Sequence, residues 1–232
     1  MRIALLVAVS ALVAGCSGGA DGTSDRAEST TATTGATSSQ NPSSTSTRAT
    51  TPAPIAATPP RQGAAIADVV AWIEAATPAD VARYHSMTRG GDTTDLGADV
   101  AFTTAGAETN CVTNRYQDGA LACLVKLADP PPRPPGLETA WKANWVDFTG
   151  TTVDVGSPHG DPGPFVDGTG AELPNGESLA FGDYRCRADT AGLFCVDYSH
   201  QTAVALSARG VEPFGCLQKT APPADIGLRF SC

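Results

Sequence analysis

The chain has 232 residues, a formal net charge of −9 at pH 7, 24 glycines and 18 prolines. Its acidic balance argues against nucleic acid as a partner, because DNA and RNA carry phosphate backbones of the same sign. The high glycine and proline content favours turns and short strands over long helices.

The N-terminus has the pattern of an export signal. Arg2 precedes a predominantly apolar stretch over residues 3–14. A membrane-spanning helix needs about 20 apolar residues, so this shorter stretch predicts a secretory signal peptide over residues 1–15. It ends in Val13-Ala14-Gly15-Cys16, which resembles the lipobox of bacterial lipoproteins. That resemblance implies cleavage before Cys16, its acylation, and anchoring of the protein to the extracytoplasmic face of the cell membrane. The alternative is ordinary secretion with Cys16 free or paired.

Residues 16–62 are predicted to be a disordered tether. They are rich in Ser, Thr, Ala, Gly and Pro, and contain almost no large apolar side chains. Such a segment cannot bury enough surface to offset its chain entropy. As a random coil it would hold a domain roughly 40 Å from the membrane. Its Ser/Thr-Pro composition is also typical of O-glycosylated stalks, and an unmodified spacer is equally compatible with it.

Residues 63–232 are predicted to be one extracytoplasmic domain, mainly β with short N-terminal helices (α+β). Apolar residues recur at helical spacing from Ile66 to Ile73, and a second short helix is expected from an N-cap at Thr77 to Ser86, with Val81 and Tyr84 facing inward. Beyond Asp92 the pattern changes to short β-rich runs that favour antiparallel hairpins. Strands are expected at Val100–Thr103, Asn110–Thr113, Ala120–Leu127, Trp145–Thr149, Tyr184–Arg187, Leu193–Tyr198, Ala203–Leu206 and Leu228–Ser231. Gly156–Gly176 is expected to be a surface loop with a short strand at Phe165.

The six cysteines of this domain predict three disulfides. Two pairs flank predicted hairpins, and cross-strand positions bring Cα atoms within disulfide range. The last two cysteines would pin the C-terminus. The expected pairs are Cys111–Cys123, Cys186–Cys195 and Cys216–Cys232. A metal site is the competing interpretation, but the sequence has no Cys-x2-Cys pair and an exported chain meets an oxidising compartment.

A resemblance extends over the whole chain. Its landmarks occur in the order Asn110-Cys111, Leu121–Cys123, Pro130–Pro135, Leu179–Gly182, Tyr184–Cys186, Gly192–Cys195 and Val204–Ser207. This order resembles a family of uncharacterised actinobacterial secreted and lipoprotein domains with disulfide hairpins. The chain is more specifically similar to mycobacterial lipoproteins of the LppI type. The resemblance implies an envelope location, and it transfers no activity, cofactor or catalytic residue.

Motifs for catalysis or cofactor binding are sparse, and no cofactor is expected. The sequence has three histidines, His85, His159 and His200, but no phosphate loop, His-Glu-x-x-His motif or dinucleotide fingerprint. His159 and Asp161 are close in sequence, but two ligands on a glycine-rich loop do not make a metal site. A hydrolase with a site near His85 or His159 is the alternative hypothesis for function.

The favoured hypothesis is a non-enzymatic binding or structural module for an envelope lipid, glycan or protein. Trp141, Trp145 and Phe148 are the candidate binding residues, because aromatic side chains often line ligand grooves. Core packing against the proline-rich stretch at 130–135 is the alternative role for these rings.

Overall fold

A computed structural model describes residues 58–114, 116–117 and 119–232. The expected signal peptide, Cys16 and the tether up to residue 57 lie outside the described residues. Thr58 begins the described part, shortly before the expected domain boundary at Gly63. Within this part, no helix combines the length and apolar character that crossing a bilayer requires.

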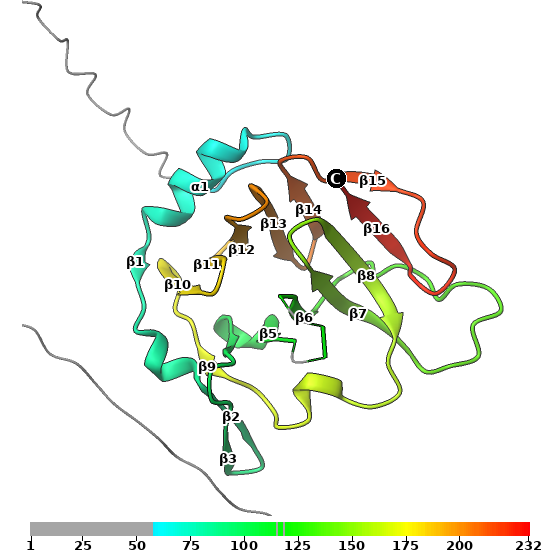
Figure 1. Ribbon diagram of the computed structural model, residues 1–232, viewed down its shortest axis with the longest axis horizontal. Coiled ribbons are helices and arrows are strands. Elements are labelled where there is room, and N and C mark those ends of the chain that lie inside the picture. The colour runs from blue at the N-terminus through cyan, green and yellow to red at the C-terminus, as the bar shows by residue number, and fades with distance from the viewer. Residues whose placement is uncertain (1–57, 115, 118) are drawn as a thin grey trace, which may run out of the picture. The chain divides into compact units, whose positions relative to one another are not determined.

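Two sheets of mainly antiparallel strands form the framework of residues 58–232 (Figure 1). The six-stranded sheet has the order β1-β10-β11-β12-β13-β14. Its strands are β1 (Thr77–Pro78), β10 (Glu177–Phe181), β11 (Tyr184–Asp189), β12 (Gly192–Asp197), β13 (Thr202–Ser207) and β14 (Gly210–Phe214). The mainly β class expected from the sequence is therefore confirmed.

The eight-stranded sheet has the order β15-β16-β8-β7-β6-β5-β4-β9. Its strands are β4 (Ala101–Thr103), β5 (Thr109–Thr113), β6 (Leu121–Val125), β7 (Trp141–Phe148), β8 (Thr152–Pro158), β9 (Ala171–Glu172), β15 (Gln218–Thr220) and β16 (Leu228–Ser231). A short 3-10 helix, η2 (Ala105–Ala107), links β4 to β5. A separate hairpin joins β2 (Ser86–Arg89) to β3 (Asp92–Asp95) through Gly90 and Gly91, which both have positive φ.

The main core lies between the two sheets. Side chains alternate along each strand, so Leu193 of β12 enters the shared core while the next residue, Phe194, faces the opposite side. There the helix α1 (Ile66–Glu74) covers the six-stranded sheet, and the rings of Trp72 and Phe194 meet edge to face at 4.8 Å. Fully burying one such large apolar side chain contributes about 1.5–3 kcal/mol.

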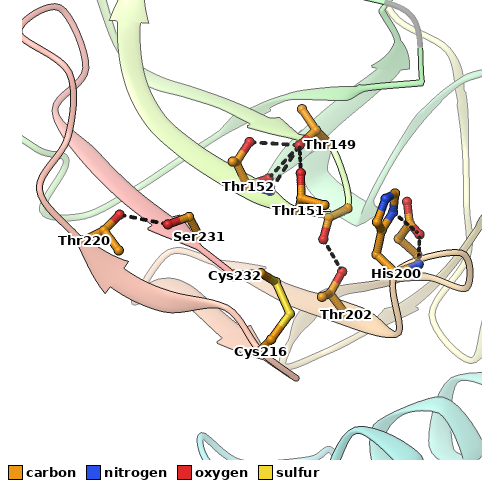
Figure 2. The surroundings of a disulfide bond; sticks show 11 residues. Thr149, Thr151, Thr152, His200, Thr202, Cys216, Thr220, Ser231 and Cys232 are labelled. Carbon is orange, nitrogen blue, oxygen red and sulfur yellow. Dashed lines mark hydrogen bonds and ion pairs between the residues drawn. A yellow bond between two sulfur atoms is a disulfide. The ribbon is translucent and has the colours of Figure 1, made fainter.

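The three expected disulfides are present. Cys111–Cys123 and Cys186–Cys195 join directly paired residues of neighbouring strands, with Cα–Cα distances of 4.1 and 4.0 Å. Both bridges are buried in the shared core, one from each sheet. Cys216–Cys232 closes the C-terminus, where the backbone N–H of Cys232 also donates to the Thr151 carbonyl oxygen of the β7–β8 turn (3.1 Å). Figure 2 shows this bridge beside the threonine hydroxyls of that turn.

The expected second helix is wrong in extent. Thr77 is not its N-cap, because its backbone N–H donates to Gly176 and the residue belongs to β1, which pairs in parallel with β10. Sheet pairing therefore overrides the local capping signal. Only one 3-10 turn follows, η1 (Val81–Tyr84), capped by the Asp80 carboxylate. The inward direction of Tyr84 is confirmed, since that side chain is fully buried.

The strand expected at Phe165 is also wrong. Phe165 ends a 3-10 helix, η3 (Gly163–Phe165). Pro162 and Pro164 lack backbone N–H groups and so cannot donate to a sheet ladder, and the Asp161 carboxylate accepts a hydrogen bond from Gly163 N (2.9 Å). The expected loop 156–176 also contains the end of β8 and the short strand β9.

Candidate functional site

Strand β7 places two functional side chains on the outer face of the eight-stranded sheet. Val146 and Phe148 point into the shared core, whereas Trp145 and Asp147 alternate to the other side. A register shift between Lys142 and Val146 interrupts the pairing of β7 with β8. This irregularity separates the environments of Trp141 and Trp145, although both belong to the same strand.

The structure does not bring the three candidate aromatic residues into one groove. The Trp141 ring lies against Gly156, where an added Cβ would be 2.6 Å from the indole and 3.0 Å from Pro131. Phe148 is buried between the sheets and meets the Tyr184 ring at 5.6 Å. Trp141 therefore packs against the proline-rich segment, Phe148 belongs to the core, and Trp145 adjoins a pocket.

Trp145 lies at the base of a pocket of about 440 Å³. Its indole is buried under His159, whose ring is stacked on it at a centroid distance of 3.5 Å and an interplanar angle of 20°. Phe165 meets the same indole edge to face at 5.1 Å. Residues of the segment 161–166 line the pocket together with Asn114 and Tyr116.

Two exposed apolar side chains line this pocket. Tyr116 and Val166 are the two large hydrophobic side chains that the described residues leave exposed, at 71% and 40%. Both line the pocket at Trp145. Isolated exposed apolar residues need no explanation, but their convergence on a concave, polar-lined site is typical of ligand pockets.

His159 is held in its neutral form. Burial lowers the pKa of its imidazole and Lys142 lowers it further, while the Asp161 carboxylate acts in the opposite direction. The backbone N–H of His159 donates to the Ala140 carbonyl oxygen at 3.1 Å, which fixes the residue after the end of β8. At neutral pH the ring therefore presents an uncharged aromatic face and ring nitrogens that can donate and accept hydrogen bonds.

A buried carboxylate supports the indole of the pocket. Asp147 Oδ2 accepts a hydrogen bond from Trp145 Nε1 (2.9 Å). Within the described part of the chain, Asp147 Oδ1 is buried without a hydrogen-bond partner, and Asn114, which acts to lower the pKa of Asp147, accepts through its Oδ1 from the backbone N–H of Tyr116 at 3.0 Å. Asp147 thus supports the buried indole, and Asn114 holds the backbone of Tyr116.

The charge on Asp147 is costly in this environment. Burial, and secondarily the charge of Asp154 on the paired position of β8, raise its pKa to about 6, although the hydrogen bond from Trp145 and the Asn114 side chain oppose the rise. Asp154 is itself paired with Arg229 of β16, whose Nε donates to Asp154 Oδ1 at 2.6 Å. The Arg229 guanidinium therefore balances the negative charge of Asp154, the cross-strand neighbour of Asp147.

The other histidines lie elsewhere. His85 Nδ1 is hydrogen-bonded to the Asp99 backbone carbonyl oxygen at 2.9 Å. His200 Nδ1 lies 3.1 Å from Asp197 Oδ1 and 2.9 Å from Ser199 Oγ. Both partners contact the same ring nitrogen, and Asp197 also accepts from the His200 backbone N–H (2.9 Å), which is the pattern of a capped turn.

Among residues 58–114, 116–117 and 119–232, no three His, Cys, Asp or Glu side chains are grouped closely enough to hold a metal ion. Neither His85 nor His159 has, within that part, both a carboxylate and a hydroxyl at hydrogen-bonding distance. The hydrolase hypothesis gains no geometric support at those two positions.

Several residues of the pocket were not identified from the sequence. Asn114 and Asp147 are ordinary polar residues at strand ends, and Tyr116 follows a predicted strand without any distinguishing motif. The alternation of Trp145, Val146 and Asp147 was the one available signal, because it predicts that Trp145 and Asp147 share a face. Nothing in the local sequence indicates that His159 stacks on Trp145.

Comparisons with known proteins identify no relative. No family model, curated protein or solved structure matches this chain.

Proposed function

We propose that this chain is an exported lipoprotein, anchored through Cys16 to the extracytoplasmic face of the cell membrane, whose folded part is a non-enzymatic binding module. The export-type N-terminus, the lipobox-like Val13–Cys16 and the resemblance to mycobacterial LppI-type lipoproteins support the anchor. The six remaining cysteines all pair, which fits an oxidising compartment. Stable attachment needs more than one acyl chain.

The pocket at Trp145 is the binding site in this proposal. The observation that carries it is the convergence of the exposed Tyr116 and Val166 on a concave site that also contains His159 and Asp161. Apolar walls with a few oriented polar groups are the usual composition of a small-molecule site. Its support by Asp147 keeps the walls in place before a ligand arrives, which reduces the entropic cost of binding.

The binding proposal is tested by native mass spectrometry of the full chain isolated from its own cell envelope. We expect a retained mass that is released on denaturation and is lost in the His159→Ala variant. His85→Ala is the matched control, because His85 lies outside this pocket. Retention of the same mass by His159→Ala, or an empty wild-type protein, would contradict the proposal.

The anchor is tested separately by metabolic labelling with an alkyne-bearing fatty acid. Wild-type protein should carry the label and sediment with membranes, whereas Cys16→Ala should do neither. Equal labelling of the two proteins would refute lipidation at Cys16.

A further inference from the structure

The pocket combines ring faces with hydrogen-bonding groups. His159 offers an imidazole stacked on Trp145, and the exposed Tyr116 also lines the pocket. Aromatic rings bury large apolar faces while their polar atoms remain able to form hydrogen bonds. A ligand that fits both features has a compact ring with C–H groups on its faces and polar groups on its edge.

Asp161 requires donors from such a ligand. Its Oδ1 accepts from Gly163 N at 2.9 Å, and its exposed carboxylate has no hydrogen bond to Oδ2 within the described residues. An ionised carboxylate only accepts hydrogen bonds, and bonds to it are stronger than neutral ones. Hydroxyl groups satisfy this requirement, whereas phosphate and carboxylate groups do not.

The charges around the pocket disfavour an anionic ligand. Asp161 lines the pocket, and Asp147 lies directly beneath it in contact with Trp145. Lys142 and Arg89 are the neighbouring cations, but neither side chain lines the pocket, and Arg89 Nη1 donates to the Val166 carbonyl oxygen at 2.7 Å. The neutral His159 adds no positive charge. An anion would therefore face an uncompensated carboxylate.

An acyl chain fits no better. Covering Asp161 and His159 with hydrocarbon would remove water from polar groups without replacing their hydrogen bonds, which costs roughly 1–3 kcal/mol for each such group. Tyr116 and Val166 are the two large hydrophobic side chains exposed in the lining. A protein partner would need a far larger surface than this pocket offers.

We infer that the pocket between Tyr116 and His159 binds an uncharged carbohydrate of the cell envelope, with a sugar ring against the two aromatic side chains and its hydroxyls donating to Asp161. This inference rests on the proposed binding function and narrows its ligand to one chemical class. His159 contributes the stacking face and a ring nitrogen, and Asp161 contributes orientation and the preference for hydroxyl donors.

The test uses the full chain in a detergent without a sugar head group. Neutral trisaccharides of mannose, galactose and arabinose are titrated against tryptophan fluorescence, with trigalacturonate as the acidic counterpart and glycerol 3-phosphate as the probe for an anionic lipid head group. We expect saturable binding of at least one neutral trisaccharide. His159→Ala should weaken it at least 10-fold, while His159→Phe, which retains a stacking ring, should lose less.

Asp161→Asn and Asp161→Ala separate the two roles of that side chain. Asn retains an oxygen for Gly163 N and for a sugar hydroxyl, so it should bind more tightly than Ala and should weaken the discrimination against trigalacturonate. His85→Ala should bind as wild type does, and matching near-ultraviolet circular dichroism spectra would exclude unfolding of the variants.

Two results would overturn the inference. One is binding of trigalacturonate or glycerol 3-phosphate without binding of any neutral trisaccharide, and the other is neutral-sugar binding that His159→Ala leaves unchanged. If native mass spectrometry finds a pocket-dependent ligand that is not a carbohydrate, the binding function survives and the carbohydrate inference falls. If it finds no ligand and no trisaccharide binds, both fail.

Discussion

Replacing Asp147 with Asn should stabilise the protein at high pH. The folded state holds the pKa of Asp147 at about 6, above its ordinary value of 3.8, mainly because burial penalises the charge. A difference of this size costs the ionised folded state about 3 kcal/mol of unfolding free energy. Asn keeps an oxygen acceptor for Trp145 Nε1 and removes the negative charge opposite Asp154.

The sign of the pH dependence follows from the direction of this shift. Below about pH 3 the carboxyl group is largely protonated in both the folded and the unfolded chain, and even at pH 4 the substitution should change stability by under about 1 kcal/mol. Between pH 4 and 6 the unfolded chain releases its proton first, and the wild type loses stability relative to Asp147→Asn. Above pH 6 the difference should reach its full value of about 3 kcal/mol.

Urea unfolding with the disulfides intact, followed by tryptophan fluorescence at pH 4 and pH 8, measures this difference. Asp154→Asn is the matched control, because it leaves the partly buried Arg229 without its carboxylate partner and should destabilise the protein at pH 8. The reasoning is refuted if Asp147→Asn destabilises the protein at pH 8, or if its effect is the same at both pH values.

Three further substitutions test the framework by equilibrium unfolding. Gly150→Ala should lower the free energy of unfolding by more than about 1 kcal/mol, because Gly150 has φ +85° and an added Cβ would lie 2.5 Å from Asp197 Oδ2. An unchanged free energy of unfolding would contradict this packing. Tyr184→Phe should lower the free energy of unfolding by about 1–3 kcal/mol, because it removes a hydroxyl that donates to two backbone carbonyl oxygens at 2.6 and 3.0 Å. A variant as stable as the wild type would show that these bonds contribute nothing. Replacing Cys186 and Cys195 together by Ala should cost about 3 kcal/mol, and a loss of under 1 kcal/mol would count against a stabilising role for that bridge.

Local patterns predicted the parts of the fold that depend on neighbouring residues. The hairpin containing Cys186 and Cys195 could be identified because its alternating strands, its turn and its cysteines lie within one short segment. In contrast, the hairpin β2–β3 was missed, because its strands carry mostly polar side chains and its pairing depends on Gly90 and Gly91. β1 was missed because its partner β10 lies far along the chain.

The candidate site was predicted less completely, for the same reason. Trp145 was recognised as a candidate, but its role depends on His159, which reaches it from beyond β8, and on Asn114 from the end of β5. Trp141 and Phe148 looked equivalent to Trp145 in the sequence. They differ because the strand alternates and its pairing is irregular, which sends the three rings into three different environments.

Under a pulling force, the segments without disulfides should respond differently from the loops that the disulfides close. None of them joins a strand of one sheet to a strand of the other, and none includes α1 or β1. A pulling force applied at the N-terminal end of the described part would first load the packing of α1 and the two-residue pairing of β1 with β10. The cross-linked loops, which span sequence separations of 12, 9 and 16 residues, would stay closed and shorten the length to which the unfolded chain could extend.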